Sequence, residues 1–108
     1  MLVLDENLPA GQRQRLRNWR VHFRVIGIDI APSGTKDENL IAVFHQLSRV
    51  TFVTLDRNFF RPDWCHANYC LAWLDVAADE AADFTRLFLR HPSFSTQTNR
   101  LGKVRPSP

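Results

Sequence analysis

Short apolar segments that end in an acidic residue are the main pattern along this chain. Residues 2–5 and 51–55 predict strands, with Asp5 closing the first and Asp56 directly following the second. Residues 69–74 form a continuous apolar run that predicts another strand. Runs of this length are typical of parallel strands buried on both faces, and ligands bind at the carboxyl ends of such strands. The pattern therefore predicts a carboxylate site at one edge of a sheet.

The segments between these runs predict helices. Asn7 is the predicted cap of a first helix. Thr35 and Glu38 form a capping box at the start of a second, and Asp79 begins a third that Pro92 stops. The side chains predicted to face the core from these helices are Leu8, Leu16, Trp19, Leu40, Ile41, Phe44, Leu47, Ala81, Phe84, Leu87 and Phe88.

The alternation of strands and helices predicts an α/β domain. Residues 21–26 alternate apolar and polar positions, as a half-exposed strand does, which brings the expected number of strands to about four. This order favours a small, mostly parallel sheet with right-handed crossovers and helices on both faces. We expect the domain to span residues 1–91, because residues 92–108 are polar and basic and predict a largely irregular tail with room for short ordered pieces.

The composition excludes several classes of protein. Hydrophobic residues make up 44% of the 108 residues and charged residues 23%, which is typical of one globular domain. No apolar run approaches the roughly 20 residues that cross a bilayer. Asp5 and Glu6 interrupt the apolar start, unlike a signal peptide, so we expect a cytoplasmic protein. In the cytoplasm we expect Cys65 and Cys70 to be reduced. The alternative is a zinc site formed by these cysteines and His66, but it lacks a fourth ligand.

Three aspartates are the predicted catalytic and metal-binding residues. Asp5 and Asp56 end strands, and Asp37 opens the helix that leads into the second of them, so all three belong to one sheet edge. Clustered carboxylates favour a bound cation, and hard oxygen ligands suit Mg²⁺ or Mn²⁺. Such an ion polarises a phosphodiester and lowers the pKa of a bound water. Glu6 and Glu38, each beside one of these acids, are predicted secondary ligands.

Each acid also has a purely structural interpretation. Asp37, like Glu6 and Glu38, can complement the dipole at a helix N-terminus, and Asp56 can form a turn with the residues after it. Thr54 lies two positions before Asp56 and therefore on the same face of the strand. Its hydroxyl either orients the carboxylate or belongs to an ordinary β-branched strand residue.

The basic residues favour a polyanionic partner. The net charge is +3, and five arginines lie between residues 13 and 24. Arg13, Arg17 and Arg57 are the predicted contacts to nucleic-acid phosphates. An aromatic loop after the strand at residues 51–55 either stacks unpaired bases or packs its own rings onto the core. This loop contains Phe59, Phe60, Arg61 and Trp64.

Three segments resemble the short PIN-like domain proteins of bacteria. They are residues 4–9 (LDENLP), 37–41 (DENLI) and 53–59 (VTLDRNF). PIN domains are metal-dependent ribonucleases, many of them toxins of toxin–antitoxin pairs. The resemblance covers residues 1–75 and implies that Asp5, Asp37 and Asp56 match the family's metal-binding acids. It also implies an RNA substrate, an antitoxin protein as partner and a possible homodimer. The family carries a further acid, and residues 20–28 contain none.

Three functions are consistent with these residues. The leading one is a ribonuclease that uses Mg²⁺ or Mn²⁺ to cleave RNA phosphodiester bonds, as the toxin of a toxin–antitoxin pair. The second is a non-catalytic PIN-like interaction module with a degenerate acidic pocket, which the missing acid favours. The third is a receiver-like phosphoacceptor domain, but such a domain has a lysine after a late strand, and none follows Asp75 until Lys103.

Overall fold

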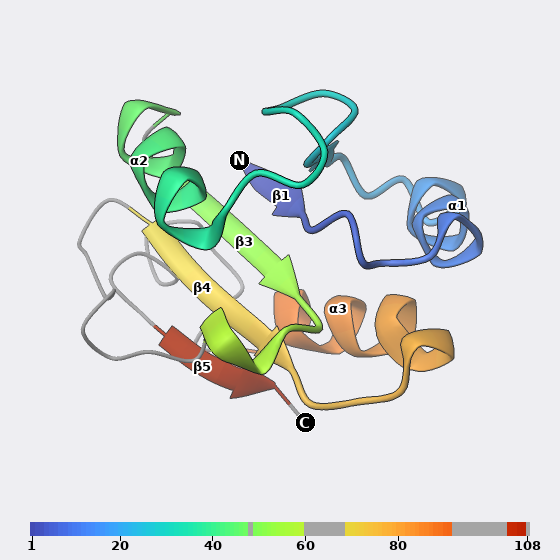
Figure 1. The fold of residues 1–108 in the computed structure, drawn as a ribbon. Coiled ribbons are helices and arrows are strands. Elements are labelled where there is room, and N and C mark those ends of the chain that lie inside the picture. The colour runs from blue at the N-terminus through green and yellow to red at the C-terminus, as the bar shows by residue number, and fades with distance from the viewer. Residues whose placement is uncertain (48, 60–68, 92–103, 108) are drawn as a thin grey trace.

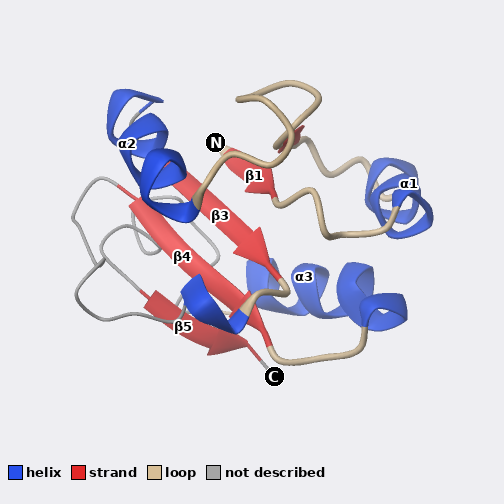
Figure 2. Ribbon diagram, viewed as in Figure 1, coloured by secondary structure: helices blue, strands red, loops and turns tan. Residues whose placement is uncertain are grey.

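The computed structural model describes residues 1–47, 49–59, 69–91 and 104–107. It contains five parallel strands in the order β2-β1-β3-β4-β5 (Figure 1, Figure 2). The strands are β1 (Leu2–Leu4), β2 (Arg24–Val25), β3 (Val50–Thr54), β4 (Tyr69–Leu74) and β5 (Val104–Ser107). The helices are α1 (Ala10–Asn18), α2 (Asp37–Leu47) and α3 (Ala81–Arg90), with short 3₁₀ helices η1 (Arg57–Phe59) and η3 (Ala78–Glu80). The predicted α/β class and parallel sheet are confirmed.

Helices cover both faces of the sheet. On one face, Leu2 and Leu4 of β1 share a core cluster with Leu16 of α1 and Phe88 of α3. On the other face, Val3 packs in a second cluster that includes residues of α2 and η1. This alternation along β1 is what a strand buried on both faces requires. Figure 2 shows α2 and α3 on opposite sides of the central strands. No helix in the described part of the chain is long and apolar enough to cross a membrane.

The centre of the sheet brings the predicted strand-end acids to one edge. β1 and β3 are parallel neighbours with Leu4 in register with Val53. The N–H of Asp5 continues this ladder by donating to the carbonyl of Val53 over 2.9 Å. Residues that follow β1 and β3 therefore emerge side by side, as expected for a parallel pair.

The edge strand β2 is shorter than the strand predicted over residues 21–26. Before it, Arg20 adopts a left-handed conformation with φ 62° where the chain leaves α1. After it, the chain folds back at once, and the carbonyl of Val25 accepts the N–H groups of residues 28–30. The N–H of Val25 donates to Oδ2 of Asp29 over 3.0 Å. The polar groups of Val25 that point away from β1 are thus satisfied within the chain.

A fifth strand lies in the segment predicted to be an irregular tail. Val104–Ser107 pairs in parallel with β4, so these four residues are a short ordered piece of the segment predicted to be largely irregular. Pro106 lies in this edge strand, where the loss of a backbone donor is tolerated. The C-terminal segment therefore contributes to the same sheet as the predicted domain, residues 1–91.

Three helical details also differ from the prediction. α1 begins at Ala10 with no side chain capping it, so the predicted cap at Asn7 is wrong. α2 begins at Asp37, one residue later than a cap at Thr35 requires, and the Thr35 hydroxyl donates to the carbonyl of Pro32 over 2.6 Å. Leu87 is 56% exposed, although its position predicted an inward-facing side chain.

Candidate metal centre at the carboxyl edge of the sheet

Asp5 is the most enclosed acid of this edge. It directly follows β1, and only 7% of its surface is exposed. Its Oδ2 accepts a hydrogen bond from Oγ1 of Thr54 over 2.6 Å, and its Oδ1 accepts one from the N–H of Glu6 over 2.8 Å. The β1–β3 register produces the first bond, because residues 5 and 54 each follow the paired Leu4 and Val53. The carboxylate is therefore held in a fixed orientation.

The environment of Asp5 disfavours its negative charge. Burial raises the pKa of Asp5, and the neighbouring charges of Glu6 and Asp56 raise it further. The hydrogen bonds from Thr54 and from the N–H of Glu6 act in the opposite direction without cancelling the effect. No lysine, arginine or histidine among the described residues forms an ion pair with Asp5. A buried carboxylate beside a second acid is a suitable partner for a cation.

Asp56 forms the predicted turn, and its charge acts on Asp5. It is half-buried at the end of β3, and its Oδ1 accepts the N–H of Asn58 over 2.9 Å as η1 begins. The turn predicted for this aspartate is therefore present. Its charge also acts on Asp5, so the predicted approach of these two acids is present as well. One oxygen of Asp56 is used in the turn, and the side chain remains partly open to solvent.

Thr54 connects the two acids. Its hydroxyl donates to Asp5 and accepts the N–H of Asp56 over 3.0 Å. The side-chain amide of Asn7 makes a longer contact to the same hydroxyl, 3.5 Å, and its Oδ1 accepts the N–H of Leu55 over 3.4 Å. Thr54 was expected to orient the carboxylate of Asp56 or to be an ordinary strand residue, and its hydroxyl instead donates to the carboxylate of Asp5. Sequence reasoning missed Asn7, whose position two residues after Asp5 was the available signal.

Glu6 is an exposed acid that ties down the loop after β2. Its Oε2 accepts the hydroxyl of Ser33 over 2.6 Å, and its Oε1 accepts the N–H of Gly34 over 2.9 Å. These hydrogen bonds lower the pKa of Glu6. Gly27 leaves room for this arrangement, because a Cβ at that position would lie 3.2 Å from Oε2 of Glu6. Glu6, a predicted secondary metal ligand, is therefore engaged with residues 33 and 34.

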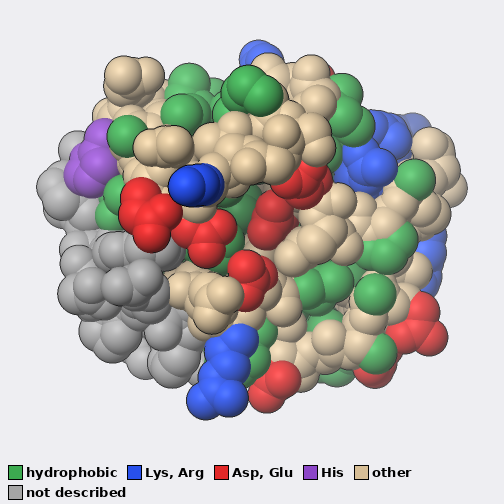
Figure 3. Space-filling view, viewed as in Figure 1, with side chains coloured by type: hydrophobic (Ala, Val, Ile, Leu, Met, Phe, Trp, Pro, Cys, Tyr) green, Lys and Arg blue, Asp and Glu red, His purple; other side chains and the backbone are tan. Residues whose placement is uncertain are grey.

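The two acids of α2 lie on the same face of the molecule but do not complete a cluster. Asp37 is half-buried and Glu38 exposed, both in the first turn of α2. Figure 3 shows acidic side chains gathered over the start of α2 and the ends of β1 and β3. Within the described ranges, however, no three or more Asp, Glu, His or Cys side chains are arranged to hold one metal ion. The structure thus brings Asp5 and Asp56 together and leaves Asp37 outside that pair.

The three predicted phosphate-binding arginines differ in their surroundings. The guanidinium of Arg17 lies 5.0 Å from the ring centroid of Phe23, and that of Arg57 lies 5.9 Å from the ring centroid of Trp73. Arg13 is half-buried and lines a small cavity beside Glu6. Arg13 is therefore the one of the three that is enclosed by the fold beside the acidic edge.

The aromatic loop does not offer Phe59 for base stacking. Phe59 is 1% exposed, and its ring packs against Phe52 with centroids 4.9 Å apart. The alternative, packing onto the core, is correct for this residue. The other members of that loop, and Cys65 and His66 of the zinc alternative, lie outside the described residues.

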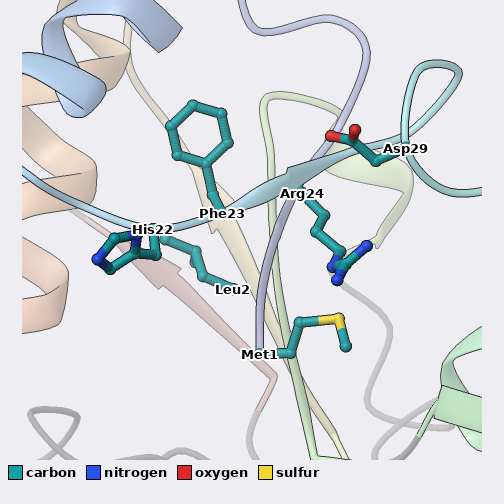
Figure 4. A pocket seen from close by; sticks show the side chains of 6 residues that line it. All are labelled: Met1, Leu2, His22, Phe23, Arg24 and Asp29. Atoms are coloured by element: carbon teal, nitrogen blue, oxygen red, sulfur yellow. The ribbon is translucent and has the colours of Figure 1, made fainter.

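A second cavity lies away from the paired acids. It has a volume of about 380 Å³ and is lined by the start of β1, by residues 22–24 and by Asp29 (Figure 4). Its acid, Asp29, already accepts the N–H of Val25. This cavity therefore lacks the paired carboxylates that distinguish the carboxyl edge.

Comparison of the chain with protein-family models, with curated proteins and with solved structures gave no significant match.

Proposed function

We propose that this protein is a metal-dependent nuclease that cleaves RNA in the cytoplasm, with Asp5 at the centre of its active site. The observation that carries the proposal is the buried, oriented carboxylate of Asp5 beside Asp56, at the sheet edge where α/β proteins bind ligands. An uncompensated pair of acids at such a position is typical of a cation site. The PIN-like resemblance of the same segments supports the choice of RNA as the substrate.

The residues of this edge suit Mg²⁺ or Mn²⁺. Each oxygen of Asp5 accepts one hydrogen bond and so keeps a second lone pair for a cation. Asp56 is half-buried and has one oxygen outside its turn. Mg²⁺ commonly uses one or two carboxylates, several waters and substrate phosphates, so a pair of aspartates is enough for a proposed site. When bound, the ion supplies Lewis-acid stabilisation of a phosphodiester and lowers the pKa of a water.

The side chains around this pair have separate proposed roles. Thr54 positions Asp5 from β3 and keeps its carboxylate aimed in one direction. Asp37 and Glu38, in the first turn of α2, are proposed to approach the substrate-bound ion. Basic side chains beside the edge, Arg13 above all, are proposed to hold the negative RNA backbone. Positioning and charge neutralisation are the main requirements of phosphoryl transfer.

A direct assay tests this proposal. Purified wild-type protein is incubated with end-labelled single-stranded RNA and Mn²⁺, next to Asp5→Asn and to the exposed control Asp79→Asn. We expect cleavage by the wild type and by Asp79→Asn, loss of cleavage with EDTA, and at least a hundredfold slower cleavage by Asp5→Asn. Equal cleavage by wild type and Asp5→Asn would assign the activity to a contaminant or to other residues.

A non-catalytic interaction module is the second candidate. It is favoured by the lack of a three-ligand group among the described residues and of an acid in residues 20–28. Calorimetry separates the two functions: heat of Mg²⁺ or Mn²⁺ binding that Asp5→Asn abolishes supports the nuclease. The absence of heat at millimolar ion, together with intact RNA in the assay above, supports the module. We also propose an antitoxin partner, which co-purification tests, and a homodimer, which sedimentation tests.

A further inference from the structure

We infer that the groove between the C-terminal ends of α1 and α3 binds an acidic, amphipathic segment of a partner protein. Such a segment inserts one large apolar side chain into the groove and places carboxylates beside Arg86 and Arg90. The inference goes beyond the proposed function, because it concerns a different surface and holds whether or not the protein cleaves RNA.

The groove lies at the end of a series of contacts between the two helices. Arg15 of α1 pairs with Asp83 of α3 over 2.9 Å. About one turn further along both helices, the guanidinium of Arg86 lies 4.6 Å from the ring centroid of Trp19. Next to this contact the helices leave a groove with a volume of about 190 Å³, enough for one large side chain. Its described lining consists of Trp19, Val21, Arg86, Leu89 and Arg90.

The end of α1 fixes one wall of this groove. Arg20 has φ 62°, and its N–H donates to the carbonyl of Arg17 over 2.9 Å. The N–H of Val21 donates to the carbonyl of Leu16 over 3.0 Å. These are the two hydrogen bonds of a Schellman motif. The three apolar side chains of the lining are half-buried and pack against the core cluster below them. The groove is therefore formed before a ligand binds, which reduces the entropic cost of binding.

Two arginines give the groove a positive charge. Arg86 and Arg90 are one turn apart on α3, and neither forms an ion pair with an acid of the described residues. Like charges at this spacing on a helix repel each other. The described lining contains no carboxylate that would balance them. Carboxylates of a partner would remove this repulsion, so the groove favours an acidic ligand with an apolar side chain.

A protein segment fits this groove better than RNA does. Val21 and Leu89 are aliphatic and offer no ring on which an unpaired base stacks. Both helices follow a strand and run back toward the amino edge of the parallel sheet, so their C-terminal ends lie away from Asp5. An apolar anchor in a pocket, with complementary charges around it, is typical of the centre of a protein–protein interface.

Selection from a library of short random peptides displayed on phage tests the inference. Peptides are selected on immobilised wild-type protein after depletion on the bare matrix. We expect the enriched sequences to combine one large apolar residue with several Asp or Glu residues. Enrichment of peptides without acidic residues, or the absence of any enrichment over the bare matrix, would overturn the inference.

Binding of the most enriched peptide, synthesised with a fluorescent label, locates its site. Anisotropy compares the wild type with Arg90→Glu and with the matched control Arg24→Glu, which changes an exposed arginine of β2. We expect about tenfold weaker binding by Arg90→Glu, a change within about twofold in the control, and weaker binding at high salt. Thermal melts confirm that each variant is folded. Equal binding by the wild type and Arg90→Glu would contradict the inference.

Nuclear magnetic resonance gives a second readout that does not depend on a charge reversal. The indole N–H signal of Trp19, assigned by its loss in Trp19→Phe, is followed as the unlabelled peptide is added to the wild type. We expect a saturable shift of this signal. A peptide that binds without shifting it occupies another surface, and that result would also overturn the inference.

Two other occupants have their own outcomes. Single-stranded RNA that displaces the peptide and shifts the Trp19 signal would assign the groove to RNA. A concentration-dependent dimer of the wild type that Arg90→Glu abolishes in sedimentation would assign it to a second copy of this chain. We expect neither result, and neither depends on whether the protein cleaves RNA.

Discussion

The hydroxyl of Thr54 donates to the buried carboxylate of Asp5 over 2.6 Å, joining β3 to β1 at the point where both strands end. The same hydroxyl accepts the N–H of Asp56, so one side chain links the two acids of the candidate metal centre. This bond is formed across 49 residues of sequence and depends on the parallel register of the two strands.

Removal of this hydroxyl should be costly. Thr54→Val keeps the shape of the side chain but leaves Asp5 with one hydrogen bond fewer in a buried place. We expect the free energy of unfolding to fall by about 1–3 kcal/mol, and metal binding to weaken, because the carboxylate is no longer oriented. Urea unfolding and calorimetry with Mn²⁺ measure the two effects.

Thr85 provides a matched control for that substitution. It is also fully buried, but its hydroxyl has no hydrogen-bond partner among the described residues. Thr85→Val should therefore leave stability unchanged or raise it, by less than about 1 kcal/mol. Equal losses in the two variants would show that the Thr54 bond has no special importance.

Asp5 should also give the protein a characteristic dependence on pH. Its pKa in the folded protein is raised above the ordinary value of 3.8, so the protonated form is favoured by folding. The contribution of Asp5 to stability is therefore fully present below pH 3.8 and is lost as the pH rises through the folded-state pKa. The side chain at position 5 in Asp5→Asn cannot ionise, so this variant does not lose stability through that position as the pH rises.

The difference in unfolding free energy between Asp5→Asn and wild type should accordingly shift in favour of the variant as the pH rises above 3.8, and then level off. Urea unfolding at a series of pH values in EDTA measures it. A difference that is constant from pH 3 to 7 would contradict the effect of burial.

Glu6 should show the opposite behaviour. Hydrogen bonds from Ser33 and Gly34 lower its pKa below the ordinary 4.5, so its stabilising contribution is present above pH 4.5 and lost as the pH falls through the folded-state pKa. Glu6→Gln should increase amide hydrogen exchange at Gly34 several-fold at neutral pH, because a charge-assisted acceptor is replaced. The exposed variant Glu38→Gln should exchange as wild type does at that amide.

Gly27 should not tolerate a side chain. It has φ +86°, and an added Cβ would lie 3.2 Å from Oε2 of Glu6 and 3.3 Å from Cα of Ser33. Gly27→Ala should destabilise the protein by about 1–2 kcal/mol or more, from the left-handed conformation and this crowding. Gly11 lies in α1, and an added Cβ there would have nothing within 4 Å. Gly11→Ala should therefore raise the free energy of unfolding by about 0.5–1 kcal/mol. Melting temperatures of the two variants would decide this.

The sequence was sufficient for features that depend on local pattern. The apolar run at residues 69–74 became β4 without change, and the runs before Asp5 and Asp56 became β1 and β3. The approach of those two acids follows from strand ends alone. Their link through Thr54 was not predicted, because the sequence suggested Thr54 only as a residue that orients Asp56, whereas its hydroxyl donates to Asp5.

Features that depend on distant partners could not be predicted. Asparagine is a common helix cap, but the side chain of Asn7 contacts the hydroxyl of Thr54 and the N–H of Leu55 instead. These partners come close to Asn7 only when β1 and β3 pair. β5 has no apolar run, and its existence depends on pairing with β4. The residues around Phe59 in the sequence do not indicate that its ring packs against Phe52. In each case tertiary contacts outweighed local preference.

The short turn after β2 also determines how the sheet can associate with other chains. An edge strand normally presents free N–H and C=O groups that recruit another strand, but those of Val25 are occupied by Asp29 and residues 28–30. The sheet is thus closed to strand addition on its β2 side. Among the described residues, the β5 edge remains for any assembly that extends the sheet, and Pro106 removes one donor from it. An aggregate or dimer built by strand pairing would therefore form through the C-terminal strand and not through the N-terminal half of the protein.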